Sequence, residues 1–278
     1  MEKPLWNPTQ DRIESSRLYA FQKTIEAKTG KTFPDYDSLW QWSITDPETF
    51  WNDVWDFCGL IGEKGPTVLK NGNQMPGAQF FPDSKVNYAE NLLRRRDAAT
   101  AIIFLSETGT ERTLTYAQLY DEASRWQQAL TEAGMKTGDR IALYLPNTPE
   151  ALIVTLAAAS MGVLVSLASP DFGVQGAVDR FGQIEPKILV AVDGYFYNGK
   201  TIDCTQKVRD IRTHIPSVEK TVIVPFLGKE DAADIIADDF IAPYAPQDIP
   251  FRRLPFNHPL FIMFSSGTTG VPKCIVHG

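Results

Sequence analysis

The sequence predicts an α/β protein with a mostly parallel sheet and helices on both faces, preceded by a Trp-rich, mainly helical N-terminal segment. Three apolar runs, "RIALYL", "GVLVSLA" and "KILVAV", alternate with segments that show helical periodicity. Buried strands joined by helices form a βαβαβ array, in which the strands run parallel. Five of the six tryptophans precede residue 88. We therefore expect a helical segment over 1–87 and an α/β segment over 88–278.

The N-terminal segment contains a helix start followed by an aromatic face. Asp46 can cap a helix that has Pro47 at its first position. One face of this helix then carries Phe50, Trp51, Val54, Trp55 and Cys58. Such a face can be a ligand cage or a packing surface, and we expect it to pack against a neighbouring domain. The stretch 62–77, rich in Gly, Pro, Lys and Asn, is typical of a loop.

The α/β segment begins with two strands and a capped helix. "AIIFLS" is a short apolar strand, and "SETGTER" supplies a turn before "TLTY". Thr115 and Gln118 have the spacing of a capping box. Leu119, Ala123, Trp126 and Leu130 then mark one helical face, and Gly134 is placed to end the helix.

The uncharged stretch 151–168 approaches the roughly 20 residues that a membrane-spanning helix requires. We interpret it instead as a buried helix that leads into a buried strand, because Thr148 and Pro149 fit a helix start and Gly162 fits its end. Beyond it we expect a loop at "SPDFG", a helix over 174–184, the strand "KILVAV", a helix over 208–214 and the strand "TVIVPF". The acidic stretch "GKEDAADIIADDF" predicts a solvated helix and loop.

Composition and charge disfavour several functional classes. The 278 residues are 43% hydrophobic with a formal net charge of −7, which predicts a globular protein without the basic clusters that bind nucleic acid. The N-terminus lacks an apolar signal region, so we expect a cytoplasmic location and no membrane partner. Cys58, Cys204 and Cys274 lack the spacing of a disulfide framework or a zinc site. Scattered histidines and the absence of a GxSxG elbow predict no catalytic residue and no metal ligand in this chain.

The C-terminal stretch "FSSGTTGVPK" has the residue types that hold a polyphosphate. Glycines let backbone N–H groups approach closely, hydroxyls add donors, and a lysine adds a positive charge. A Walker loop is disfavoured, since the glycines are three apart and the lysine follows three residues later. The apolar runs "LFIMF" and "CIVH" predict strands on both sides of the loop. A hairpin without a ligand is the alternative interpretation.

At every position, "FSSGTTGVPK" resembles the phosphate-binding signature of the adenylate-forming superfamily, which includes acyl-CoA synthetases. "TLTYAQL", "GDRIALYLPNTPE" and "AAASMG" are similar to the first αβ subdomain of that superfamily. "FWNDVWDFCGLIG", "PDSKVNYAENLL" and "ASPDFGVQGAVDRFGQIEPKILV" resemble the acetoacetyl-CoA synthetase family in order and spacing, over nearly the whole chain.

The resemblance implies an acid–CoA ligase reaction in two halves. A carboxylate such as acetoacetate attacks the α-phosphate of ATP–Mg²⁺ to give an acyl-adenylate and pyrophosphate, and coenzyme A then displaces AMP. Carried onto this sequence, the residues that hold the ATP phosphates are Ser265, Ser266, Gly267, Thr268, Thr269, Gly270 and Lys273. Ser265 can instead serve the hairpin, and Lys273 can be a solvated surface charge.

The coenzyme A half is implied less directly. In related acetyl-CoA synthetases, the loop that matches Ser169–Phe172 lies against the nucleotide, and a basic residue near Lys200 meets its 3′-phosphate. This chain departs from that pattern, since Ser169, Pro170 and Asp171 replace an aromatic residue and glycines, and Tyr197 replaces an arginine. An ordinary surface lysine is therefore the alternative for Lys200.

The resemblance also implies that this chain is the N-terminal part of a longer enzyme and is inactive alone, because the adenine, acyl and C-terminal segments of the family come after the phosphate loop. The alternatives left open are a ligase for acetate, propionate or butyrate, a noncatalytic nucleotide-binding or assembly module, and a P-loop NTPase or kinase. We also expect the terminal strand to leave an exposed sheet edge that promotes association.

Overall fold

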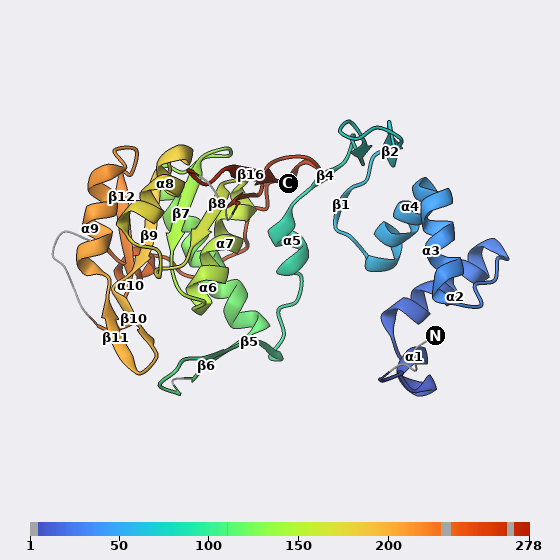
Figure 1. The fold of residues 1–278 in the computed structure, drawn as a ribbon, viewed down its shortest axis with the longest axis horizontal. Helices are drawn as coiled ribbons and strands as arrows, with labels where there is room; N and C mark the ends of the chain where they lie inside the picture. The colour runs from blue at the N-terminus through green and yellow to red at the C-terminus, as the bar shows by residue number, and fades with distance from the viewer. Residues whose placement is uncertain (1–4, 110, 229–234, 266–269) are drawn as a thin grey trace. The chain divides into compact units, whose positions relative to one another are not determined.

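The structure, a computed structural model, describes residues 5–109, 111–228, 235–265 and 270–278. The chain forms two compact units (Figure 1). Unit 1 comprises Met1–Leu60 and Lys64–Asp83, and unit 2 comprises Ile61–Glu63 and Ser84–Gly278. Unit 1 is mainly helical and unit 2 is the α/β part, so the predicted fold class is confirmed.

Unit 1 consists of four helices and a short antiparallel strand pair. The helices are α1 (Gln10–Glu14), α2 (Arg17–Thr29), α3 (Tyr36–Thr45) and α4 (Pro47–Cys58), and the strands are β2 (Leu69–Lys70) and β3 (Gln79–Phe80). Asp46 caps α4 as predicted, accepting the Thr49 N–H at 3.4 Å. The predicted loop over 62–77 is largely irregular, interrupted by Gly62–Glu63 and β2.

The aromatic face of α4 packs within its own unit. A buried cluster on α2, α3 and the segment between them comprises Phe21, Ile25, Phe33, Leu39 and Trp42, and the α4 residues Phe50, Val54 and Phe57 pack against it. Trp51 and Trp55 contact Phe80 and Phe81, with ring centroids 5.7 and 4.9 Å apart. Cys58 is exposed, so its assignment to the buried face was wrong.

The seven-stranded sheet of unit 2 has the order β13-β12-β9-β7-β8-β15-β16. Its strands are β7 (Arg140–Tyr144), β8 (Leu164–Ala168), β9 (Ile188–Val192), β12 (Lys220–Val224), β13 (Ile235–Ile236), β15 (Phe261–Phe264) and β16 (Cys274–His277). All neighbours pair parallel except β15 and β16, which are antiparallel. Every residue of β9 is buried, which explains its continuous apolar sequence.

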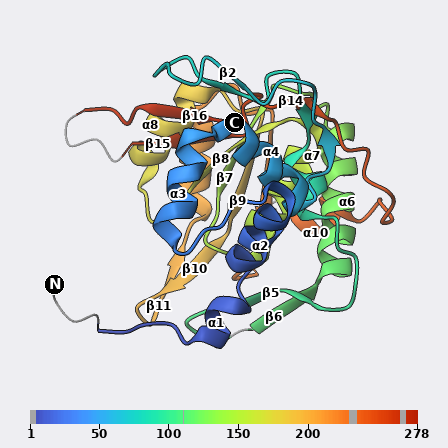
Figure 2. The ribbon, with the colours of Figure 1, turned by 90° about the vertical axis from the view of Figure 1, so that its right-hand side faces the viewer.

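Helices cover both faces of this sheet, as Figure 2 shows for α6 and α8. The helices of unit 2 are α5 (Tyr88–Leu92), α6 (Tyr116–Glu132), α7 (Pro149–Met161), α8 (Val174–Ile184), α9 (Thr205–His214) and α10 (Ala237–Ile241). Helices α6 and α7 pack together, as do α8 and α9. Among the described residues, no helix combines the length and the hydropathy that crossing a bilayer requires.

Smaller sheets surround the main one. The predicted "AIIFLS" and "TLTY" strands form the antiparallel pair β5 (Thr100–Leu105) and β6 (Glu111–Thr115), separate from the main sheet. The other small sheets contain β1 (Gly62–Glu63), β4 (Lys85–Val86) and β14 (Leu254–Pro255), and the hairpin of β10 (Gly194–Tyr197) and β11 (Lys200–Asp203).

The helix caps follow the sequence with one exception. Thr115 and Gln118 form the predicted capping box at α6. Gly162 ends α7 in the left-handed region with φ +77°, and a Cβ at this position would overlap the Leu254 side chain. Thr148 is the N-cap residue of α7, but its side chain makes no capping hydrogen bond. The predicted helix start at Thr148 and Pro149 is therefore confirmed, but without the hydrogen bond that a threonine cap usually accepts.

The acidic stretch 228–240 differs from its prediction where the structure describes it. Ile235 and Ile236 form β13 and pair parallel with β12. Ala237 and Ile241 of α10 are buried in the unit 2 core. The apolar residues inside the acidic run therefore extend the sheet instead of forming a solvated surface helix.

Asn87 joins three segments of unit 2. It is 3% exposed, and its side-chain amide donates to the carbonyls of Ala159 at 3.0 Å, Ser160 at 3.1 Å and Arg252 at 2.8 Å. Its Oδ1 accepts the Glu90 N–H at 3.1 Å and so caps α5. One buried side chain thus holds the start of α5, the end of α7 and the segment before β14 together.

Candidate functional site

The predicted phosphate loop connects β15 to β16, the edge strand at one side of the main sheet. Strands β15 and β16 pair antiparallel, with Phe264 opposite Cys274. The prediction of strands on both sides of the loop is therefore confirmed, and strand β16 follows the loop where a Walker loop would continue into a helix. Ser266, Gly267, Thr268 and Thr269 lie outside the described residues.

The neck of this loop is closed by Ser265 and Lys273. The Ser265 N–H donates to the Lys273 carbonyl at 3.0 Å, and the Lys273 N–H donates to the Ser265 Oγ at 3.3 Å. The Ser265 hydroxyl therefore has the hairpin role that the sequence left open. Gly270 has φ +91°, a backbone conformation that favours glycine, and the Lys273 side chain is exposed.

Gln183 at the end of α8 anchors the C-terminal side of the loop. Its Nε2 donates to the Pro272 carbonyl at 2.8 Å, and its Oε1 accepts from the Cys274 Sγ at 3.7 Å. This contact joins residues 89 positions apart. Sequence reasoning missed it, because a glutamine inside an amphipathic helix carries no signal for a distant partner.

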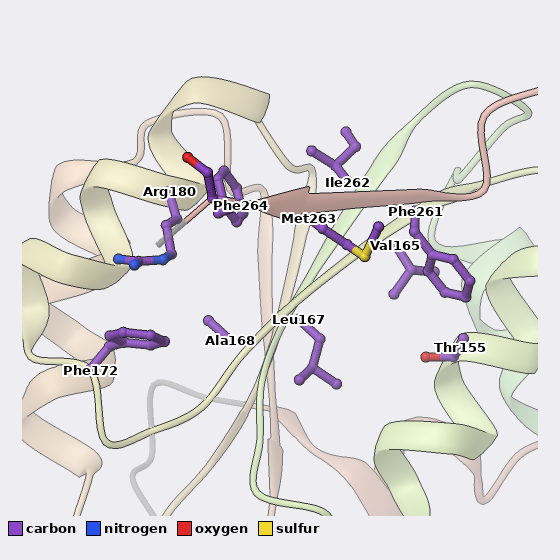
Figure 3. Close-up of a pocket in the computed structure, with 11 residues that line it drawn as sticks. Thr155, Val165, Leu167, Ala168, Phe172, Arg180, Phe261, Ile262, Met263 and Phe264 are labelled. Atoms are coloured by element: carbon purple, nitrogen blue, oxygen red, sulfur yellow. The ribbon is translucent and has the colours of Figure 1, made fainter. Parts of the chain in front are cut away.

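A cavity of about 660 Å³ lies beside the neck, between β8, β15 and α8 (Figure 3). Its walls are mainly apolar, and Ser265 forms part of the lining. Arg180 is the charged residue of this lining, and its guanidinium lies 4.0 Å from the Phe172 ring centroid and 6.0 Å from that of Phe264. The cavity can therefore hold an apolar group next to the phosphate loop, with one cation among aromatic rings.

The "SPDFG" loop follows β8 and is held by tyrosines from neighbouring strands. The Tyr144 hydroxyl donates to the Pro170 carbonyl at 2.9 Å, and the Tyr195 hydroxyl donates to an Asp171 carboxylate oxygen at 2.7 Å. The Tyr195 and Ser169 hydroxyls lower the pKa of Asp171 by hydrogen bonding to its charged form. Asp171 is therefore an anion, a poor neighbour for a phosphate of coenzyme A.

Lys200 lies on the separate hairpin of β10 and β11, where it is exposed and pairs with Tyr197. Nearby Cys204 is fully buried, and burial raises the pKa of its thiol to about 11. This thiol is therefore protonated and unreactive at neutral pH.

The described residues contain no cluster of three or more His, Cys, Asp or Glu side chains suited to a metal. His214 and His258 contact the carbonyls of Asp210 and Gly162, at 2.7 and 3.1 Å. Cys58, Cys204 and Cys274 all lie in the described residues, and none of them forms a disulfide. The hydrogen bonds of His214 and His258 give these two residues structural roles within the fold.

The parallel sheet and the hairpin of β15 and β16 define an α/β unit of the class that the signature predicts, and comparisons with known proteins place it in a family. The family model "AMP-binding enzyme" matches residues 89–278, and "Acetyl-coenzyme A synthetase N-terminus" matches residues 36–92. The chain belongs to the AMP-binding enzyme family.

Individual relatives carry a more specific name. The chain is 45% identical to an acetoacetyl-coenzyme A synthetase of Rhizobium meliloti (strain 1021), over 99% of this chain and 43% of the relative. It is 36% identical to the acetoacetyl-CoA synthetase of Macaca fascicularis, over 98% of this chain and 42% of the relative. The solved structure of acetoacetyl-CoA synthetase from Streptomyces lividans matches with a TM-score of 0.93 and 35% identity, over 99% of this chain and 43% of that chain. The predicted resemblance is confirmed, and the chain spans less than half the length of these relatives.

Proposed function

We propose that this chain forms the ATP-phosphate-binding part of an AMP-forming ligase that activates acetoacetate and transfers it to coenzyme A. The observation that carries the proposal is the complete "FSSGTTGVPK" signature placed between β15 and β16. The names of the relatives supply the acid and the thiol. The free thiols are compatible with a cytoplasmic location.

In this proposal, backbone N–H groups and hydroxyls from Ser266 to Gly270 hold the β- and γ-phosphates of ATP. Gly270 fits the role because its positive φ lets the backbone turn without a side chain in the way. Lys273 supplies a positive charge to the departing pyrophosphate, and Ser265 positions the neck. ATP would enter with Mg²⁺, which neutralises phosphate charge.

For coenzyme A, we retain Lys200 as the residue that would meet a phosphate of the nucleotide. Its exposure on the β10–β11 hairpin allows such a contact. The anionic Asp171 in the neighbouring loop argues that the nucleotide would lie differently from that in acetyl-CoA synthetases. The acids to compare are therefore acetoacetate, acetate, propionate and butyrate.

The test is acid-dependent exchange of labelled pyrophosphate into ATP, measured on the protein that carries this chain. Lys273→Ala should lower the exchange rate by roughly 10- to 1,000-fold, because the positive charge that stabilises the leaving pyrophosphate is lost. Lys136→Ala, which removes an exposed lysine before β7, is the matched control. Lys200→Ala should raise the KM for coenzyme A and leave the exchange unchanged.

Two outcomes would contradict the proposal. Unchanged nucleotide binding in Lys273→Ala would favour a noncatalytic module. ATP hydrolysis without added acid or coenzyme A would favour an NTPase. Exchange with acetate but not acetoacetate would keep the class of reaction and change the substrate.

A further inference from the structure

A second cavity of about 660 Å³ lies at the carboxyl ends of parallel strands of unit 2. Thr148 follows β7, Val224 ends β12, and both line the cavity. Strand β7 stands between β8 and β9, so the connection from β7 to β8 and the connection from β8 to β9 run in opposite directions along the sheet. In open α/β sheets, this reversal is where small-molecule sites form. The proposed phosphate loop lies at the other edge of the sheet, between β15 and β16.

Two buried polar atoms of the lining have no hydrogen-bond partner among the described residues. One is the Thr148 Oγ1, on a residue that is 4% exposed and leaves α7 without a side-chain cap. The other is the Arg125 Nε of α6. A buried donor without an acceptor is costly, and such groups are uncommon in folded proteins. Because both residues line the cavity, a ligand bound there can supply the missing acceptors.

The charges of the lining disfavour an anionic ligand. Arg112 already pairs with Glu150, and its Nη2 lies 3.5 Å from a Glu122 oxygen. Asp238 adds a third acid, so three acidic side chains line the cavity against the two cations Arg112 and Arg125. Glu150 also occupies the first turn of α7, so the positive end of that helix already faces an acid. Burial raises the pKa of Glu122, which favours its neutral form.

Aromatic rings form the apolar wall. The Phe226 ring centroid lies 6.1 Å from that of Phe104 and 5.6 Å from that of Phe196. Trp126 lines the same cavity from α6 and is 1% exposed. Such rings offer faces and edges to a planar guest. Side chains alternate along a strand, so Phe196 lies on the opposite side of β10 from Tyr195 and Tyr197. The aromatic wall of the cavity is therefore on the other side of β10 from Tyr195, which hydrogen bonds to Asp171.

We propose that this cavity binds an uncharged, planar heteroaromatic amine of nucleobase size. Its ring nitrogens accept hydrogen bonds from the Arg125 Nε and the Thr148 hydroxyl, and its amino group donates to Glu122. The rings of Phe104, Phe226 and Trp126 enclose its faces. This site is additional to the proposed phosphate loop and does not depend on the ligase function.

The experiment is calorimetric titration of the 278-residue chain with adenine, indole and benzoate. Adenine offers ring acceptors and an amino donor, indole offers a donor without ring acceptors, and benzoate is an anion of similar size. Adenine is expected to bind with a dissociation constant of about 1 mM or tighter, given the efficiency of small ligands. Indole and benzoate should bind at least about tenfold more weakly, because the two orphaned donors stay unpaired or the acids repel the anion.

Variants locate the site. Arg125→Met and Thr148→Val should each weaken adenine binding about tenfold, whereas Thr148→Ser should retain it. Thr148→Val is expected to leave the melting temperature unchanged or raise it, since it removes an orphaned hydroxyl; a merely structural role predicts the reverse. Arg209→Met and Thr213→Val on α9 are matched controls. Ala242→Phe, at the end of α10, should block the cavity without removing a polar group.

Three results would overturn the proposal. The first is no adenine binding at concentrations about tenfold above the expected constant. The second is equal affinity for adenine and benzoate. The third is weaker adenine binding in Lys273→Ala combined with unchanged binding in Arg125→Met, which would place the ligand at the phosphate loop.

Discussion

Replacing Asn87 by alanine should destabilise unit 2 more than any surface change. The substitution leaves the carbonyls of Ala159, Ser160 and Arg252 without their buried donor. An amide has two N–H groups, so about two full hydrogen bonds are lost, each worth about 1 kcal/mol. Loss of the α5 cap adds about 1 kcal/mol. The expected decrease in the free energy of unfolding is therefore about 3 kcal/mol.

Native-state hydrogen exchange is the appropriate assay, because the chain has two units and a single melting curve would mix them. Amides of the buried strands β7 and β9 report the opening of unit 2. A loss of about 3 kcal/mol lowers their protection roughly a hundredfold. Asn87→Ser keeps a capping oxygen and should recover about 1 kcal/mol of the loss.

The matched control is Asn147→Ala, which removes an exposed asparagine from the same unit. The reasoning is refuted if Asn87→Ala and Asn147→Ala lower protection equally. It is also refuted if Asn87→Ser is as unstable as Asn87→Ala, because the cap would then contribute nothing.

Three further predictions concern pH, a helix end and the sheet edge. Hydrogen bonding from Lys23 is the main cause that lowers the pKa of Glu26 to about 2 from its usual 4.5. The contribution of the ionised Glu26 to folding stability is therefore present above pH 4.5 and is lost as the pH falls toward 2. Glu26→Gln should flatten the acid unfolding curve in this pH range, and an unchanged curve would contradict the prediction. Gly162→Ala should lower the free energy of unfolding by about 3 kcal/mol, and Gly134→Ala by only about 1 kcal/mol. Both glycines have a positive φ, but only at Gly162 would the added Cβ overlap a neighbouring side chain. Equal losses in thermal unfolding experiments would contradict the steric cause. Val276→Lys on the exposed strand β16 should reduce concentration-dependent association in sedimentation experiments, and unchanged association would place the contact elsewhere.

Local sequence patterns determined most secondary structure. The Thr115–Gln118 spacing specified the start of α6, and the continuous apolar runs specified the buried strands. These features depend on residues within a few positions of each other, where backbone geometry and hydrogen bonding decide the outcome. The signature "FSSGTTGVPK" likewise identified the family and its flanking strands, because such a loop is a contiguous segment.

Other features depended on partners far along the chain. The local pattern at Thr148 predicted a helix start, but the tertiary structure leaves its buried hydroxyl without a partner among the described residues, beside a cavity that Thr148 lines. Other contacts also join residues that are distant in the sequence. They are the hydrogen bonds of Asn87 to Arg252 and of Gln183 to Pro272, and the pairing of Ile235 and Ile236 with β12. The sequence by itself determined the buried strands, the helix starts and the family, whereas only the tertiary structure decided which buried polar atoms find a hydrogen-bond partner. The physical reason is that a hydrogen bond or a buried contact requires two groups to meet in space, and no local pattern states where the second group will be.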